Sequence, residues 1–428
     1  MQALNSRDEQ EYFPDGTVID PWFYDCTVPS LDSLGRQYKL TDYGILPDGK
    51  IHTEEIQALI DRAAELGGGV IVVPEGEFLS GSIYFKQGVS LHILKGGVLK
   101  GSDSICDYDL KMTRIEGESC LYFTALINGE GLHGFSITGE GKIDGNGHRS
   151  WRAFWQRRAW NPDCTNKDEQ RPRLIYLEKC TDVLISGLEL VNSHFWTTHI
   201  YKCRRVKYLG CRILSPASPV KAPSTDAIDI DACCDVLIKG CHLEVNDDAV
   251  ALKGGKGPYA DTAEENGSNQ RIIIEDCHYG YCHGCLTCGS ESVHSRNIIM
   301  RRIEVDTGEN MLWLKMRPDT PQLYEYIRVE DVKGNVKNFL NINPWTQFFD
   351  LKGREDAPLS YARNVTVKDC IFNCRNYFAV KADDSRYILS DFRLEGLDIT
   401  AADVSFDPTA VRNITVENVT LTEAPDAF

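Results

Sequence analysis

Residues 236–243, VLIKGCHL, carry apolar side chains at the first and third positions, a glycine at the fifth and a cysteine at the sixth. Phrases of the same form begin at Phe135, Val183, Val206, Ile272, Ile298, Ile327, Val365, Phe392 and Ile414. Apolar residues at every second position predict strands with one buried face. The phrases return after 22 to 38 residues, with one gap of 48, and none could bury its apolar face alone. The sequence therefore predicts an all-β chain, a parallel β-solenoid of stacked coils.

The register of these phrases also assigns seven cysteines to the interior. Four of them lie five residues after the first apolar position of their phrase: Cys211, Cys241, Cys277 and Cys370. Three lie three residues before it: Cys180, Cys203 and Cys233. Other phrases place Leu, Ile or Val in the first of these slots, and a free cysteine packs as a small hydrophobe. We expect seven buried free thiols, because stacked side chains seldom have the torsion that a disulfide requires.

One segment has helical spacing. His52 to Glu55 supply an N-cap candidate and acidic residues, and three glycines follow at 67–69. The apolar stripe between them consists of Ile56, Leu59, Ile60, Ala63 and Ala64. We expect this N-terminal helix to cap the open apolar end of the stack. Residues 1–37 are predicted to form an irregular N-terminal arm and residues 38–428 a single solenoid domain.

The formal net charge of −17 has no basic block to offset it, which argues against nucleic acids and anionic membranes as partners. The longest apolar runs, such as residues 69–73, are too short to span a membrane. The first residues, MQALNSRDEQEYF, have neither the basic region nor the apolar region of a signal peptide. We expect a cytoplasmic protein, or a periplasmic or secreted one if a signal segment has been removed.

Two adjacent aspartates, Asp247 and Asp248, interrupt the strand pattern in VNDDAVALKGG, residues 245–255. Asp226 lies 21 residues before the first of them, close to one short coil, so the carboxylates are expected on rungs about 4.8 Å apart. The chain must bend or bulge there for both members of the pair to face one groove. Such a cluster suits calcium binding or acid–base work on a glycosidic bond. A solvated turn without function is the third alternative, and the nearby Asp229 and Asp231 add weight to it.

A histidine follows in GYCHGCLTCGSES, where His283 stands between Cys282 and Gly284. Cys282, Cys285 and Cys288 have the spacing C-x2-C-x2-C, which would suit zinc or an iron–sulfur cluster. No fourth ligand follows at a matching spacing, so we predict no metal site here.

Three basic residues lie near these acids in the sequence. Lys315 and Arg317 are separated by one residue and so lie on one face of a strand, and Lys253 follows the acidic pair. They are the local cations that an anionic sugar would need, because the overall field is unfavourable to a polyanion. Ordinary surface charge is the alternative.

Four short motifs carry a resemblance to a known family. They are Ser224-Thr225-Asp226, Asn246-Asp247-Asp248, Cys282-His283-Gly284 and Trp313-Leu314-Lys315. They resemble, in the same order, the Asn-Thr-Asp, Asp-Asp, Gly-His-Gly and Arg-Ile-Lys motifs of the polygalacturonases, family 28 of the glycoside hydrolases. The likeness extends over about residues 40 to 425 and includes GEGKIDGNG and NSHFW. It implies a right-handed, single-stranded parallel β-helix, with residues 38–428 as the catalytic domain.

The resemblance also implies roles. Asp247 would be the general acid, and Asp226 and Asp248 would activate the water of an inverting hydrolysis. Inverting pairs usually stand roughly 6.5–9.5 Å apart. His283 would orient the acid or hold its proton, and Lys315 would bind a galacturonate carboxylate. Repulsion within the cluster is expected to keep the first aspartate of the pair protonated and the second ionised. No metal and no cofactor are implied.

Three positions depart from the family motifs. Ser224 replaces Asn, Cys282 replaces Gly and Trp313 replaces Arg. Tryptophan cannot form the bidentate fork that arginine offers a carboxylate, but its face can stack on a sugar ring. The sugar beside the cleaved bond is therefore expected to differ from a plain galacturonate, unless Arg317 supplies the charge.

We expect an inverting glycoside hydrolase that acts on pectic oligosaccharides or polysaccharides. The insertion at 256–270 is expected to wall off one end of the groove and so to favour attack at chain ends. Two alternatives remain: a calcium-dependent eliminase similar to pectate lyases, and a non-catalytic carbohydrate-binding solenoid. The sequence does not specify an oligomeric state.

Overall fold

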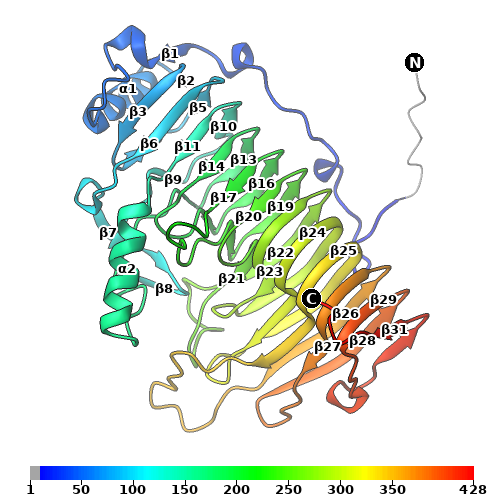
Figure 1. The fold of residues 1–428 in the computed structure, drawn as a ribbon. Coiled ribbons are helices and arrows are strands. Elements are labelled where there is room, and N and C mark those ends of the chain that lie inside the picture. Colours follow the sequence, from blue (N-terminus) through cyan, green and yellow to red (C-terminus); the bar gives the residue numbers. More distant parts are fainter. Residues whose placement is uncertain (1–9) are drawn as a thin grey trace, which may run out of the picture.

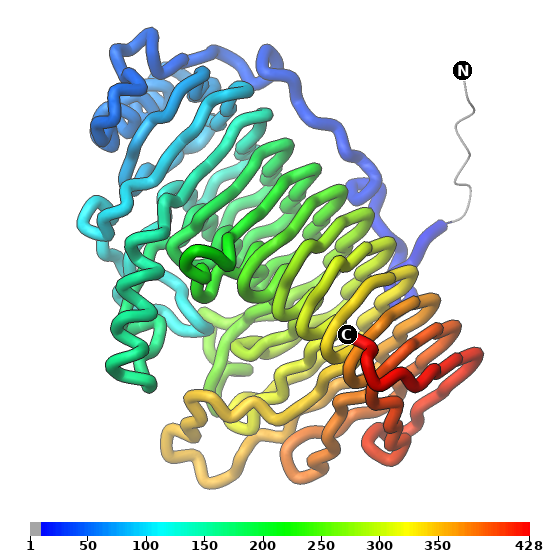
Figure 2. The backbone as a smooth tube through the Cα atoms, viewed as in Figure 1, coloured from blue at the N-terminus to red at the C-terminus, as the bar shows by residue number. Residues whose placement is uncertain are grey.

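The computed structural model describes residues 10–428 and folds as a parallel β-helix (Figures 1 and 2). Residues 1–9, which belong to the predicted arm and to the segment without a signal peptide, lie outside the described part. Except for one hairpin, the strands pair in parallel from coil to coil and form a single 29-stranded sheet. The predicted fold class is confirmed.

Three ladders run along the stack. The first, which carries the site described below, contains β4 (Ile83–Tyr84), β9 (Ile127–Glu130), β12 (Ile175–Glu178), β15 (Thr198–Tyr201), β18 (Ile228–Asp231) and β21 (Val250–Lys253). The second begins with β1 (Gln37–Lys39), β2 (Gly69–Val73), β5 (Val89–Ile93), β10 (Ser136–Gly139), β13 (Thr181–Ser186), β16 (Arg204–Leu209), β19 (Cys234–Lys239) and β22 (Ser268–Glu275). The third begins with β3 (Gly76–Ser80), β6 (Gly97–Gly101), β11 (Lys142–Asp144), β14 (Glu189–Val191), β17 (Arg212–Leu214) and β20 (His242–Glu244).

The later coils have longer strands that continue from one ladder into the next. These are β23 (His278–Cys288), β24 (His294–Met316) and β25 (Leu323–Pro344). The last coils consist of β26 (Ser360–Lys368), β27 (Ile371–Val380), β28 (Tyr387–Glu395), β29 (Asp398–Asp403), β30 (Thr415–Glu417) and β31 (Thr420–Glu423). Because β23 and β24 end in the first ladder, residues near the end of β23 lie beside β21, and residues near the end of β24 lie beside β23.

The core consists of the phrases found in the sequence. Their first apolar residues pair in an unbroken row from Val183 through Val206, Val236, Ile272, Ile298, Ile327 and Val365 to Phe392. All are at most 2% exposed. The seven cysteines predicted to be interior are buried and free. A slot filled by Cys, Leu, Ile or Val is thus a packing position, as expected.

Two helices flank the stack. Helix α1 (Thr53–Glu65) covers its N-terminal end with Ile56, Leu59 and Ile60 buried, as predicted. Helix α2 (His148–Trp160) was not predicted from the sequence. Its buried side is narrow, with Trp151 and Phe154 one turn apart, and five arginine or histidine residues obscure the stripe. Short 3-10 helices complete the set: η1 (Pro21–Phe23), η2 (Leu31–Leu34), η3 (Leu40–Tyr43), η4 (Ile105–Asp107) and η5 (Pro408–Ala410).

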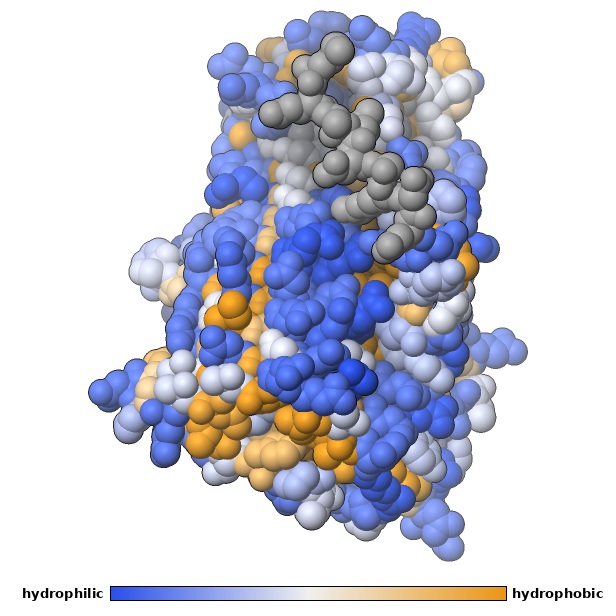
Figure 3. All heavy atoms as spheres, turned by 90° about the vertical axis from the view of Figure 1, so that its right-hand side faces the viewer, coloured by the Kyte–Doolittle hydropathy of each residue, from blue (hydrophilic) through white to orange (hydrophobic). Residues whose placement is uncertain are grey.

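The outer surface is mainly polar. Figure 3 looks onto the side away from α2, where hydrophobic side chains gather towards the end formed by the last coils. Val416 and Leu421 are exposed in these coils. Residues 10–36 run along the second ladder, against which Phe13, Ile19 and Phe23 pack. Within residues 10–428, no helix combines the length and the apolar character needed to cross a membrane.

Candidate active site

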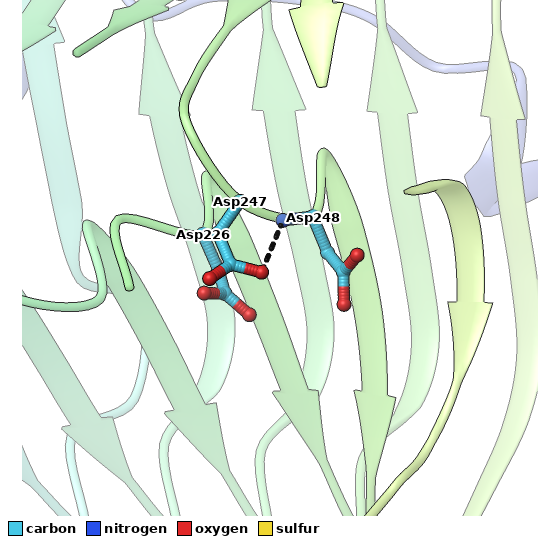
Figure 4. Close-up of side chains that lie close together, drawn as sticks. All are labelled: Asp226, Asp247 and Asp248. Carbon is cyan, nitrogen blue, oxygen red and sulfur yellow. Dashed lines mark hydrogen bonds between the residues drawn. The ribbon is translucent and has the colours of Figure 1, made fainter. Parts of the chain in front are cut away.

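Three aspartates meet at the start of strands in the first ladder. Asp226 precedes β18, and Asp247 and Asp248 lie in a bend between β20 and β21, as the sequence required. The backbone N–H of Asp248 donates to Asp247 Oδ1 at 3.1 Å (Figure 4). One carboxylate oxygen from each aspartate lies within 4.8 Å of the others. The adjacent like charges are therefore brought together with a third on the neighbouring coil.

His283 lies on the next coil and faces the first member of the pair. Its Nδ1 is 3.5 Å from Asp247 Oδ1, and its backbone N–H donates to the carbonyl oxygen of Asp247 at 2.9 Å. The adjacent Gly284 is required by close packing, since a Cβ atom there would lie 2.8 Å from Asp248 Oδ1 and 2.0 Å from Thr287 Oγ1. The Cys-His-Gly motif therefore lets the chain pass close to the acidic pair.

Two buried lysines neutralise part of the cluster. Lys315 Nζ donates to Asp248 Oδ2 at 3.0 Å. Lys253 Nζ lies 3.7 Å from Asp226 Oδ2, 3.6 Å from Asp229 Oδ1 and 3.7 Å from Glu291 Oε2. Buried charges require such partners, because an isolated one would pay the full cost of desolvation.

The protons are not distributed as expected from the sequence. Burial, followed by the charges of Asp229 and Asp247, raises the pKa of Asp226 well above its usual value. Burial also raises the pKa of Asp229, to about 8. Burial opposes the charge of Asp247, but the hydrogen bond and the charge of His283 hold its pKa below the usual value. The expectation that repulsion keeps Asp247 protonated is therefore wrong for the free protein, because His283, helped by the charges of Lys315 and Lys253, outweighs the effect of burial.

The pKa of His283 shifts in the opposite direction from that of Asp247. Burial lowers the pKa of the imidazole, but the hydrogen bond and the charge of Asp247 raise it further, so the net shift is upward. The side chains of Asp247 and His283 are 27% and 31% exposed, whereas that of Asp226 is 4% exposed. The fully buried carboxyl therefore binds a proton most readily, and the accessible one forms an ion pair.

The three aspartates line a small cleft of about 230 Å³. Other side chains along it are Glu116, Arg158, Thr165, Asn166, Trp196, Ser224, Lys253, His283, Ser290, Glu291, Trp313, Lys315, Trp345, Gln347 and Phe348. Ser224, Lys253, Trp313 and Lys315, predicted as substrate-binding residues, thus all lie at the cleft. Trp313 and Trp345 form an edge-to-face pair with ring centroids 5.5 Å apart.

Arg317 does not line the cleft, and the prediction that it supplies a missing charge there is wrong. Its side chain is buried, and its guanidinium donates to both carboxylate oxygens of Asp319, at 2.8 and 2.7 Å. It also donates to the carbonyl oxygens of Gln347 and Phe348. Arg317 thus holds the loop after β25 instead of a ligand, since β24 ends at Met316 and the chain turns away.

A hairpin borders the cleft, which its turn residue Glu116 lines. It is formed by β7 (Leu110–Ile115) and β8 (Glu118–Phe123), the antiparallel pair of the structure. Glu118 accepts a hydrogen bond from Lys167 at 2.7 Å and lies 3.8 Å from Lys256 and 3.4 Å from Lys352. These lysines come from loops after α2, β21 and β25, so one carboxylate joins three loops. Burial opposes this charge, but the lysines hold the pKa of Glu118 below its usual value.

The hairpin is also fixed to the sheet and to the predicted insertion at 256–270. Arg114 donates to Asp231 Oδ2 at 3.1 Å and to Asn266 Oδ1 at 2.7 Å. Arg173 donates to the carbonyl oxygen of Arg114 and to Thr113 Oγ1. The wall therefore forms one unit with the strands beneath it.

Comparison with known proteins identifies the family of the chain. Residues 70–334 match the family described as glycosyl hydrolases family 28. The chain belongs to this family. A probable polygalacturonase of Vitis vinifera is 32% identical over 232 residues, which cover 51% of this chain and 45% of that protein. An exopolygalacturonase of Zea mays is 25% identical over 250 residues, covering 56% of this chain and 54% of the other. The chain spans about half the length of the curated relatives that it matches.

Solved structures share the fold. An exopolygalacturonase of Thermotoga maritima has a TM-score of 0.76 at 22% identity, covering 90% of this chain and 92% of that one. A polygalacturonase of Erwinia carotovora has a TM-score of 0.69 at 20% identity, covering 88% and 95% of the two chains. The family predicted from the four motifs is confirmed, and at these identities the structural likeness concerns the fold.

Several residues of this family 28 cleft were not predicted from the sequence, among them Arg158, Glu291 and Trp345. Asp229, which lies 3.6 Å from Lys253 but does not line the cleft, was not predicted as a site residue either. A signal existed for Asp229, because Ile228 and Ile230 on either side point into the core and so place its side chain on the opposite face of the strand, where Lys253 lies. The others lie on α2 or in loops, where no period indicates direction.

Proposed function

We propose that this chain is an inverting glycoside hydrolase that removes sugars from the ends of galacturonate-containing, pectic chains. The observation that carries the proposal is the trio of carboxylates with His283 in one cleft. Paired carboxyl groups with different protonation states are what acid–base cleavage of a glycosidic bond requires.

In the proposed mechanism Asp247 donates the proton to the leaving oxygen. In the free protein the nearest protons are held by its neighbours, Asp226 beside it (Figure 4) and His283, whose Nδ1 lies 3.5 Å from Asp247 Oδ1. A sugar that enters the cleft expels water and makes the ion pair of Asp247 and His283 more costly. Transfer of the histidine proton to the carboxylate then gives a neutral pair with the acid in its active form.

The water is held by Asp226 and Asp248 together. Their nearest oxygens lie within 4.8 Å, and a single water can reach both because each hydrogen bond spans about 2.7–2.8 Å. The general acid, Asp247, also has an oxygen within 4.8 Å of both, which is closer than the roughly 6.5–9.5 Å usual between the acid and base carboxyl groups of inverting enzymes. Inversion here uses a water placed by the protonated Asp226 and by Asp248, and Asp248, which accepts a hydrogen bond from Lys315, takes the proton of the attacking water.

Action at chain ends is supported by the wall that Glu118 joins to three loops. A long chain lying through a groove needs two open ends, and this wall removes one of them. The small volume of the cleft agrees with this mode of action.

Product analysis tests the proposal. The protein is incubated with polygalacturonate, rhamnogalacturonan and their oligomers, and products are separated by anion-exchange chromatography with the anomer followed by proton NMR. We expect single, saturated sugars of inverted configuration from the first minutes. Long fragments at early times would contradict action at chain ends, and binding without any release would support a non-catalytic solenoid.

The variant Glu118→Gln tests the wall directly. We expect it to release longer products than the wild type, because the three lysines lose their common partner. Glu304→Gln is the matched control, since Glu304 is an exposed partner of Lys333 on the outer third ladder. Identical product lengths for Glu118→Gln and the wild type would remove the wall from the explanation.

Calcium-dependent elimination is the second candidate, because three carboxylate oxygens within 4.8 Å are a conceivable cation site. Two observations count against it. Lys315 already donates to Asp248, and Lys253 lies between Asp226 and Asp229, so a divalent ion would join two buried ammonium groups. An unsaturated product that absorbs in the near ultraviolet would favour elimination.

A further inference from the structure

Four basic side chains line the cleft, and three of them already have acidic partners. His283 faces Asp247, Lys315 donates to Asp248, and Lys253 lies among Asp226, Asp229 and Glu291. The fourth, Arg158, lies at the C-terminal end of α2. Among residues 10–428 no carboxylate lies within 4 Å of its guanidinium, which contacts the ring of Phe154. Arg158 is therefore the cation available to a bound carboxylate.

The opposite side of the cleft is aromatic. Trp313 faces the cleft because its neighbours on β24, Leu312 and Leu314, are buried in the core. Trp345 follows β25 and packs edge-to-face against it at 74°. Such a corner offers ring faces to the C–H groups of a sugar.

Lys315, the cation on the tryptophan side, already has partners. Lys315 Nζ lies 4.0 Å from the ring centre of Trp313 and 5.0 Å from that of Trp345, besides donating to Asp248. Its charge is thus shared between a carboxylate and two aromatic faces. Glu291, with a pKa held at about 2 despite burial by Lys253 and Lys256, adds a permanent negative charge to the cleft. The carboxylate of a sugar bound on the tryptophan side would therefore find no unpaired cation there among residues 10–428.

The two sides lie on opposite flanks of the carboxylate cluster along the stack. Helix α2 precedes β12, and Trp155 at its centre donates to the carbonyl oxygen of Lys221, just before Ser224. Trp313 pairs with Thr287 on β23 and with Asn341 on β25, which are later coils. A sugar chain that crosses the three aspartates therefore meets arginine on one side and tryptophan on the other.

From this distribution of charge we infer that the bond cleaved joins two unlike sugars. The sugar on the α2 side is a uronate, whose carboxylate binds Arg158. The sugar on the side of Trp313 and Trp345 is neutral, a hexose or deoxyhexose that stacks on the tryptophan corner. The inference rests on the proposed function for the cleavage itself, but the two binding preferences are properties of the cleft and can be measured without turnover.

Binding is measured by calorimetry with the Asp247→Asn variant and two probes of equal length. One is an oligomer of alternating galacturonate and rhamnose, and the other is an oligogalacturonate. We expect the mixed oligomer to bind about tenfold more tightly or better, as for a site that rejects an unpaired polar group. Equal or tighter binding of the oligogalacturonate, or no binding of either probe, would overturn the inference.

Substitutions in the same background locate the preference. Trp313→Arg is expected to strengthen oligogalacturonate binding and to reduce the preference about tenfold, because arginine provides the fork that a carboxylate needs. Trp345→Ala is expected to weaken the mixed oligomer selectively. Arg158→Gln is expected to weaken both probes alike. Trp160→Ala is the control, because Trp160 lies on α2 and is 87% exposed, and it should change the affinity for neither probe.

The outcomes separate the two proposals. A preference for the mixed oligomer that Trp313→Arg abolishes supports the inference even if the wild type releases no product, in which case only the proposed function fails. Conversely, turnover of both probes with a ratio that Trp313→Arg and Trp313→Phe leave unchanged overturns the inference while the proposed function stands. Thermal unfolding of each variant confirms that it is folded.

Discussion

Replacing Lys253 by methionine should destabilise the protein in a way that depends on pH. Lys253 is 4% exposed, and its Nζ lies 3.6–3.7 Å from carboxylate oxygens of Asp226, Asp229 and Glu291. Removing one partner from a buried ionic cluster costs about 3–5 kcal/mol. Unfolding entropy near about 2.1 cal/mol/K per residue gives about 0.9 kcal/mol/K for 428 residues. The expected fall in Tm is therefore about 3–6 °C.

The sign of the pH dependence follows from the shifted carboxyl groups. Asp226 and Asp229 have pKa values raised above those of the unfolded chain, the second to about 8, so their stabilising effect is present at low pH and is lost as pH rises through those values. Lys253 limits this loss because its charge opposes the upward shifts. At pH 8 the variant should therefore show the full loss. At pH 5 both aspartates hold protons, and only the ionised Glu291 still misses the cation.

Calorimetric unfolding at pH 5 and pH 8 measures this difference. Lys333→Met, which removes an exposed lysine paired with Glu304, is the control and should change Tm by less than about 1 °C at either pH. Adding Asp229→Asn to Lys253→Met should recover part of the loss at pH 8. A fall in Tm that is equal at the two pH values, or a stabilised variant at pH 8, would refute the assignment of Lys253 as the counter-ion of these carboxylates.

Three further predictions concern catalysis. Asp247→Asn should keep the fold and lose about 10²–10⁴ in kcat, the usual contribution of a general acid, and a variant within tenfold of wild type would remove Asp247 from that role. His283→Gln should move the alkaline limb of the kcat/KM profile to lower pH, because the histidine whose pKa is raised holds the acid's proton up to higher pH; an unchanged limb would contradict this. Chelation with EDTA should leave activity intact, since buried lysines neutralise the cluster, and a loss that Ca²⁺ restores would instead support elimination.

The fold could be predicted almost entirely from the sequence, because each coil of a stacked solenoid contributes the same pattern of apolar residues to the core. The row from Val183 to Phe392 is both the sequence register and the structural one. The position of the acidic trio also followed from spacing, since Asp226 and Asp247 are separated by about one coil. What followed less well was everything outside the coils. Helix α2 has only a narrow buried stripe, and loop residues such as Trp345 carry no periodic signal.

The electrostatics of the site could not be predicted from spacing either. The pKa of Asp247 depends on the hydrogen bond and the charge of His283, which outweigh the effect of burial, and the sequence spacing does not show that contact. Arg317 shows the same limit: its spacing from Lys315 suggests a shared face, but the end of β24 turns it inward to Asp319.

The wall that Glu118 ties to three loops also determines the order in which molecules leave. If this wall closes one end of the cleft, as the proposed action at chain ends requires, the chain end enters and the cut sugar leaves through the same opening. The released sugar stays behind the remainder of the chain until that remainder has departed. On the proposed function, the protein would then release its polymer after every cut and would not advance along it. A digest stopped early should accordingly contain many chains shortened by one sugar and few that have been consumed to the end.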